Sequence, residues 1–286
     1  MESQRVVQLP HAGPRRPLKD YIRHVFWAVD GTLYRKTSEI RNAQRLLLYN
    51  AFAICRTRPE IGHDPFAVGK NMLFTRIEDV PKEVRQEFDG LEANEATNPN
   101  GKYRSFGAMF AGEFGKDKYY VQRLVSTIDF GRLIARDERL IEMFSILMAR
   151  YSGIPHNILT NGTMETAIRI FAALGLDLPR FENPKIDKLF PSDPKYVRAG
   201  SRMGILCVSN LKKQKPNPEA FEQMLEVAGL RDNPRKLLYV CDSEIKDSIP
   251  AGQLGITTCL VWTEKTQSTA DFNLRAVYDL PELFEK

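Results

Sequence analysis

Five short apolar segments recur along the chain, and each is about as long as a buried β-strand. Stretches with apolar residues at helical spacing follow most of them. Because a repeated strand-then-helix order favours parallel strands joined by right-handed crossovers, the pattern predicts an α/β fold with a doubly wound parallel sheet. The segments are His24–Val29, His156–Thr160, Met203–Val208, Lys236–Cys241 and Thr257–Trp262.

Two of the intervening helices have clear ends in the sequence. After the second apolar segment, "TMETAIRIFAALGL" places Phe171 and Leu174 on one helical face and ends at Gly175. After the third, "NPEAFEQMLEVAGL" places Phe221 on an apolar face and ends at Gly229. Glycine after the last periodic residue is a common helix stop, so we predict that both helices end there.

The long stretch between the first and second segments has a helical pattern and no strand-like run. Ser38 and Asp117 are candidate N-caps for two of its helices, and prolines separate several others. A crossover of this length usually contains a separate module. The predicted helices are Ser38–Thr57, Pro81–Asn94, Tyr103–Gly115, Asp117–Ile128 and Arg136–Ser152.

These patterns predict three parts of the chain. Residues 1–20, rich in proline and arginine, are expected to form a flexible N-terminal segment. Residues 21–35 and 136–286 are expected to form the α/β core, with the sheet in the order 3-2-1-4-5. Residues 36–135 are expected to form an inserted all-helical cap domain.

Composition narrows the class of protein. The chain has 286 residues, of which 43% are hydrophobic and 27% charged, so it can bury a core. No apolar run approaches the roughly 18 residues of a membrane helix, and the N-terminus lacks a signal-peptide core. Four cysteines without a CxxC pair are expected to be reduced core thiols. We therefore expect a cytoplasmic protein that does not bind membranes.

The net charge of +5 is compatible with anionic ligands. It does not indicate a nucleic-acid partner, because the basic residues do not alternate with an aromatic platform. The four histidines are far apart in the sequence, so no histidine-based metal site is expected.

Polar residues follow four of the apolar segments. In an open parallel sheet the carboxyl ends of the strands share one edge, where ligands bind. Carboxylate oxygens suit Mg²⁺, while a lysine, a hydroxyl group and backbone amides suit a phosphate group. The residues are Asp30-Gly31-Thr32, Thr160-Asn161-Gly162, Lys215, Asp242 and Asp247.

Each of these residues also has an ordinary structural interpretation. Asp30 often occurs in turns before glycine, and Thr160 can bond to the backbone. Lys215 can be a solvated loop residue, and Asp242 and Asp247 can cap the next helix. Four polar signals at four strand ends in one order favour an active site over four separate coincidences.

These motifs resemble those of the haloacid dehalogenase-like (HAD) hydrolases across about 180 residues of the core. The first family motif is a strand ending D-x-D-G-T-[LV], and this chain has "AVDGTL". The others correspond to "NILTNG", "KPNPEAF" and "YVCDSEIKDSIPAGQLG". The helical insert resembles the first class of cap in this family. The stretches "DGTLY", "KYYVQRLVSTIDFGRLIARDERLIEMF", "TNG" and "KPNPEAF" are most similar to the pyrimidine 5′-nucleotidase-like branch.

The resemblance implies a Mg²⁺-dependent phosphomonoester hydrolase that works through an aspartyl-phosphate. Its substrate would be a small phosphorylated metabolite, with a nucleoside 5′-monophosphate as the first candidate. The nucleophilic aspartate of the family corresponds to Ala28, and the general acid/base to Asp30.

The other motif residues acquire roles from the same resemblance. Thr160 and Lys215 would bind the phosphoryl oxygens, helped by Gly31, Thr32, Asn161 and Gly162. Asp30 and Asp242 would bind Mg²⁺, and Asp247 would orient Lys215 or the waters of the metal. A dehalogenase acting on carbon is disfavoured, because such members of the family do not need a metal and the Asp30–Asp242 pair indicates one.

The side chain of Ala28 has no oxygen that could act as the nucleophile, so the chain as written is expected to be inactive. Either an aspartate was replaced to trap a substrate, or the chain is a natural pseudoenzyme that acts as a binding or scaffolding subunit. The otherwise complete set of motif residues favours the first interpretation.

Three features have no assigned role in the sequence. Tyr34 and Arg35 are either hinge residues or substrate contacts. Residues 183–212 form a longer segment than the family pattern requires, and we expect a surface excursion. The oligomeric state cannot be read from these patterns.

Overall fold

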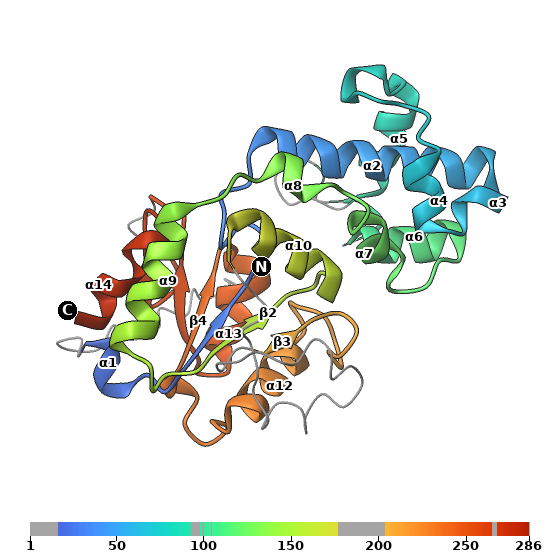
Figure 1. Ribbon diagram of the computed structural model, residues 1–286. Coiled ribbons are helices and arrows are strands. Elements are labelled where there is room, and N and C mark those ends of the chain that lie inside the picture. The colour runs from blue at the N-terminus through green and yellow to red at the C-terminus, as the bar shows by residue number, and fades with distance from the viewer. Residues whose placement is uncertain are drawn as a thin grey trace.

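A six-stranded parallel sheet forms the centre of the fold, with the strand order β3-β2-β1-β4-β5-β6 (Figure 1). The predicted doubly wound α/β fold and the order 3-2-1-4-5 are confirmed. The sequence pattern missed the short β6, which pairs with β5 at the edge. The strands are β1 His24–Trp27, β2 His156–Leu159, β3 Ile205–Leu206, β4 Leu237–Cys241, β5 Thr257–Leu260 and β6 Phe272–Asn273.

The structure is a computed structural model that describes residues 17–92, 98, 100–103, 105–176, 204–264 and 268–285. Most of the predicted N-terminal segment and of the excursion at 183–212 lies outside these residues. The described chain begins just before helix α1 (Leu18–Tyr21), whose Leu18 is fully buried. Within the described ranges, every helix is too short or too polar to cross a bilayer.

Both faces of the sheet are buried, which explains the continuous apolar runs of the strands. Side chains alternate between the faces, so Val25 and Trp27 of β1 pack into one core and Phe26 and Ala28 into the other. Helices α1, α9, α10 and α14 cover the first face, and α12 and α13 cover the second. This alternation places residue 28 on the α12–α13 side of the sheet.

The helices of the core begin and end where capping residues occur. Thr163 caps α10, and Asp137 caps α9 by accepting from the backbone of Leu140 at 3.0 Å. Gly175 and Gly229 end α10 and α12 with φ of 79° and 66°, as predicted. The core helices are α9 Glu138–Arg150, α10 Met164–Leu174, α12 Pro218–Ala228, α13 Ile249–Gln253 and α14 Leu280–Glu285, with short turns Pro234–Lys236, Glu244–Ser248 and Val277–Asp279.

Helices α2 to α8 lie together beside the sheet, between β1 and the crossover helix α9 (Figure 1). They fall within the predicted cap at residues 36–135, whose limits remain a prediction. The helices are α2 Ser38–Thr57, α3 Pro59–Gly62, α4 Pro65–Lys70, α5 Lys82–Leu91, α6 Phe106–Phe114, α7 Tyr120–Val125 and α8 Phe130–Leu133, with a 3₁₀ turn at Ile77–Asp79.

The two predicted N-caps of this helical part need correction. Thr37 caps α2, because its backbone is extended and its hydroxyl accepts from the Ile40 amide at 3.3 Å. Ser38 is already the first helical residue. Asp117 accepts from the Tyr119 amide at 2.8 Å, but α7 begins only after Tyr119. The carboxylate therefore stabilises the turn before the helix.

Two buried histidines connect β1 and β2 through side-chain contacts. Trp27 Nε1 donates to His156 Nδ1 at 3.1 Å, and His24 Nε2 lies 2.6 Å from Asn157 Nδ2. Burial lowers the pKa of His24 to about 4 and that of His156 to about 3, and His24 contributes to the lowering at His156. Both rings are therefore neutral in the folded protein at neutral pH.

These histidines should make the fold acid-sensitive from pH 6.5 down to about pH 4 for His24 and about pH 3 for His156. The unfolded chain takes up protons below pH 6.5 while the folded chain does not, so the free energy of unfolding falls as the pH falls. At pH 5 the loss reaches about 2 kcal/mol for each histidine. Urea unfolding at pH 7, 6 and 5 measures it.

The substitution His24→Gln isolates one histidine from the carboxylates that also titrate in acid. The variant should be less stable at pH 7 but should lose less stability between pH 7 and pH 5. An identical pH slope in both proteins would show that His24 is not held neutral by the fold.

Candidate active site

The predicted site residues lie beyond the carboxyl ends of β1, β2 and β4 and at the start of α12. Ala28 directly follows β1, and its amide donates to the Val240 carbonyl at 2.9 Å, so the β1–β4 ladder extends to this residue. Ala28 is 3% exposed. A side chain at position 28 therefore stands at the sheet edge, on the same face as Tyr239 and Cys241 of β4.

The turn after β1 lies against the Asp242 carboxylate. Gly31 has a φ of 81°, and a Cβ there would overlap the Asp242 carboxylate. The Thr32 hydroxyl donates to Asp242 Oδ1 at 3.2 Å, and Trp262 Nε1 donates to the Thr32 carbonyl at 2.8 Å. Asp242 thus lies directly against the turn that carries Asp30, as the motif pattern requires.

Tyr34 forms a hydrogen bond with Asp30. The sequence alone had left its role open between a hinge residue and a substrate contact. Its hydroxyl donates to Asp30 Oδ1 at 2.6 Å, and the residue is 5% exposed. Burial raises the pKa of Tyr34, and the charges of Asp30 and Asp242 raise it further. The phenol therefore stays protonated and holds one Asp30 oxygen in place.

Lys215 and Asp247 form a buried ion pair at 2.6 Å, with side chains only 8% and 5% exposed. The Tyr239 hydroxyl accepts from Lys215 Nζ at 2.7 Å and donates to Asp247 Oδ1 at 2.6 Å. Asp247 therefore contacts the Lys215 ammonium group directly. Two of the three ammonium hydrogens point at these partners, which leaves one for a ligand.

The loop after β2 positions Lys215 through its backbone. Asn161 Nδ2 donates to the Lys215 carbonyl at 2.8 Å, and Asn161 Oδ1 accepts from the Lys215 amide at 2.9 Å. Thr160 is 5% exposed, and its Oγ1 accepts from the Gly162 amide at 3.0 Å. The Thr160 hydroxyl keeps its own hydrogen for another acceptor, such as a phosphoryl oxygen.

The described residues contain no group of three or more His, Cys, Asp or Glu side chains arranged to hold a metal ion. Asp30 and Asp242 remain as a pair. Burial raises the pKa of Asp242; Lys36 opposes this shift and Asp247 adds to it. A cation beside this buried carboxylate would favour its charged form. Mg²⁺ is commonly held by one or two carboxylates together with waters and a substrate phosphate, so the pair fits this ion.

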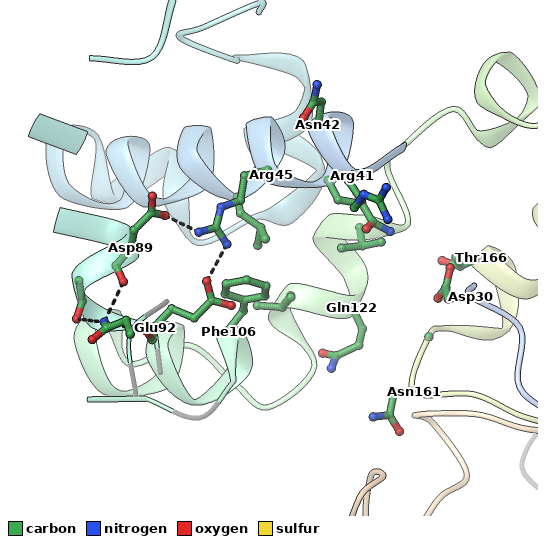
Figure 2. A pocket seen from close by; sticks show the side chains of 17 residues that line it. Asp30, Arg41, Asn42, Arg45, Asp89, Glu92, Phe106, Gln122, Asn161 and Thr166 are labelled. Carbon is green, nitrogen blue, oxygen red and sulfur yellow. Dashed lines mark hydrogen bonds and ion pairs between the residues drawn. The ribbon is translucent and has the colours of Figure 1, made fainter. Parts of the chain in front are cut away.

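A cleft of about 950 Å³ opens between this edge of the sheet and the helical part (Figure 2). A volume of this size holds a small metabolite. Asp30, Asn161, Gly162 and Thr166 line it from the core. The opposite wall comes from α2, α5, α6 and α7, and includes Arg41, Asn42, Gln44, Arg45, Asp89, Glu92, Phe106 and Gln122.

The charges at the far end of the cleft are largely paired. Arg45 bridges to Glu92 at 2.7 Å and to Asp89, and its guanidinium lies over the rings of Phe88 and Phe106. Figure 2 shows this cluster at the end farthest from Asp30. Exposed Arg41 lies on α2 nearer the core, where it adds positive charge to the cleft.

The sequence reasoning missed Tyr239 and Gln122. Tyr239 had a signal, because residues 239 and 241 of β4 share the face of residue 28. Gln122 had none, because only the tertiary arrangement brings α7 to the core. Gln122 Nε2 donates to Gln214 Oε1 at 3.3 Å across the cleft.

The substitution Tyr239→Phe should destabilise the protein by about 1–3 kcal/mol, because the buried pair of Lys215 and Asp247 loses one acceptor and one donor. Chemical denaturation measures this loss. Tyr119→Phe is the matched control, at a half-buried tyrosine just before α7. It should change stability by less than about 0.5 kcal/mol. Equal stability of the two variants would mean that the hydroxyl of Tyr239 does not support the ion pair.

Solved structures with a similar fold cover most of the chain. A HAD phosphatase from Thermococcus onnurineus has a TM-score of 0.53 at 16% identity, over 92% of this chain and 97% of that chain. A putative β-phosphoglucomutase from Thermotoga maritima has a TM-score of 0.48 at 13% identity, over 92% and 99%. A 2-haloacid dehalogenase from Pseudomonas syringae pv. Tomato has a TM-score of 0.45 at 16% identity, over 92% and 98%.

At these identities the likeness shows the fold alone. A search of curated proteins gave no significant match. The family model for haloacid dehalogenase-like hydrolases matches residues 22–255, from just before β1 to the end of α13. The chain therefore belongs to the haloacid dehalogenase-like hydrolases.

Proposed function

We propose that this chain binds the phosphate group of a small phosphomonoester and, in its present form, does not hydrolyse it. The observation that carries the proposal is the buried Lys215–Asp247 pair beside Asp242, which lies against the turn after Asp30, a residue that lines the cleft. A lysine and carboxylates with space for a cation suit a phosphate dianion, and the cleft provides room for the rest of the ligand.

Each residue of the site would contact a different part of the phosphate group or its cation. Lys215 donates its remaining ammonium hydrogen to a phosphoryl oxygen, and Thr160 donates its hydroxyl hydrogen to another. Asn161 fixes the Lys215 backbone and so sets the direction of the ammonium group. Mg²⁺ held by Asp30 and Asp242 would supply positive charge to the phosphate.

Asp30 is placed for proton transfer to the leaving oxygen of the ester. It lines the cleft, and the Tyr34 hydroxyl fixes one of its oxygens while the other stays available. In the HAD reaction that the motifs resemble, residue 28 would attack phosphorus first. A methyl group cannot do so, and no aspartyl-phosphate can form at Ala28.

The same methyl group favours a stable complex. A carboxylate at position 28 would repel a phosphate dianion placed against it, whereas alanine adds no charge. The site then holds its ligand without consuming it. This outcome is shared by a substrate-trapping variant of a phosphatase and by a natural binding subunit. A nucleoside 5′-monophosphate is the first candidate ligand, on the resemblance to the pyrimidine 5′-nucleotidase-like branch.

Thermal unfolding with and without ligand tests the proposal. With Mg²⁺ present, a phosphomonoester such as uridine 5′-monophosphate should raise the melting temperature, because ligand at 100 times its Kd adds about 2.7 kcal/mol to stability. Uridine without phosphate should not. The phosphomonoester should remain unhydrolysed, as phosphate release assays would show.

A matched pair of lysine variants locates the binding. Lys215→Met should lose the ligand-induced shift relative to its own unliganded protein, whereas Lys213→Met, at an exposed residue of the same loop, should keep it. A panel of phosphomonoesters that leaves the melting temperature of the unaltered chain unchanged would contradict the proposal.

A further inference from the structure

Gln122 on α7 has a buried amide oxygen that finds no hydrogen-bond partner in the part of the chain that the structure describes. Its Nε2 donates to Gln214 Oε1 at 3.3 Å, whereas its Oε1 is buried and has no hydrogen-bond partner among the described residues. An unpaired buried amide oxygen costs free energy, so such a group in a folded protein calls for an explanation. Gln122 also lines the cleft, which makes a ligand bound there the candidate partner for this oxygen.

The position of Gln122 relates it to one part of a ligand. Its hydrogen-bond partner Gln214 directly precedes Lys215, the residue proposed to hold the phosphate. In Figure 2 Gln122 lies on the wall of the cleft that faces Asn161 of the core. Gln122 is therefore near the end of the cleft where the leaving group joins the phosphate.

The surroundings define the chemistry that this oxygen would accept. Val121 and Val125 of the same helix line the cleft beside it and offer apolar surface. The amide is neutral, so it does not repel a nearby phosphate as a carboxylate would. A carbon framework that carries an O–H or N–H donor would satisfy both the apolar surface and the unpaired oxygen.

We propose that Gln122 is a specificity residue whose Oε1 accepts a hydrogen bond from a hydroxyl or ring N–H of the leaving group. The inference rests on the proposed function of the site and adds the class of ligand: sugar phosphates and nucleotides rather than alkyl or aryl phosphates without a donor. A ligand that lacks the donor leaves the buried oxygen unpaired, and sites of this kind reject such analogues strongly.

Three phosphomonoesters test this preference by isothermal titration calorimetry with Mg²⁺ present. Ribose 5-phosphate carries sugar hydroxyls, uridine 5′-monophosphate adds a ring N–H, and phenyl phosphate has no donor on its leaving group. The unaltered chain should bind at least one of the first two more tightly than phenyl phosphate. If the binding of ribose 5-phosphate depends on Gln122, a sugar hydroxyl supplies the donor. If only the binding of uridine 5′-monophosphate depends on it, the ring N–H of the base does.

Two variants distinguish a hydrogen bond from the ligand to Gln122 Oε1 from the hydrogen bond between Gln122 and Gln214. Gln122→Met should weaken the preferred donor-bearing ester about fivefold to tenfold and change phenyl phosphate by less than about twofold. Gln214→Met breaks the same bond between α7 and the core but retains the Gln122 oxygen, so it should preserve the preference.

A third variant tests which end of the amide faces the ligand. Gln122→Glu keeps an acceptor and adds charge, so it should weaken all three esters but maintain the ratio between donor-bearing and donor-free ligands. A ratio lost as in Gln122→Met would show that the N–H end of the amide faces the ligand and would overturn the inference.

Two further results would also overturn it. Equal weakening of all three esters by Gln122→Met would assign Gln122 a structural role. Unchanged binding of all three would assign it none. Failure of the unaltered chain to bind any of the esters is a different result, because it refutes the proposed function and the inference with it.

Discussion

The buried ion pair between Lys215 and Asp247 is the constraint on which the site depends. Both side chains are almost removed from water, at 8% and 5% exposure, and a charge buried without its partner costs about 3–5 kcal/mol. The Tyr239 hydroxyl completes the pair from within the sheet. The start of α12 and the segment after β4 must therefore stay together, and the remaining ammonium hydrogen keeps a fixed direction.

The parallel sheet explains why the other groups meet at the same place. Each strand ends at one edge, so the turn after β1 can place Gly31 against Asp242 while Asn161 after β2 holds the Lys215 backbone. The helical part closes the cleft with residues whose charges are mostly paired. Near the proposed phosphate position Lys215 stands beside the carboxylates of Asp242 and Asp247, so a bound cation would be needed to balance a phosphate dianion, and Ala28 adds no further carboxylate.

Periodicity and strand-end chemistry predicted the sheet order and the helix stops at Gly175 and Gly229, and they placed Asp242 at the same sheet edge as the turn after Asp30. Each of these follows from local pattern or from parallel topology. The two-residue β6 was too short to leave a pattern. The α2 cap fell on Thr37 because a neighbouring hydroxyl competed with Ser38. The role of Gln122 was invisible, because it depends on how the insert packs against the core.

The central claim is that position 28 lacks only the nucleophilic carboxylate that the family motif has there. Restoring it by Ala28→Asp and assaying phosphate release with Mg²⁺ tests this most directly, with Ala28→Asn as a control of the same shape that is not a carboxylate nucleophile. The account predicts turnover for the aspartate variant and none for the asparagine variant or the unaltered chain. A folded aspartate variant that binds the ester with Mg²⁺ and releases no phosphate would contradict it.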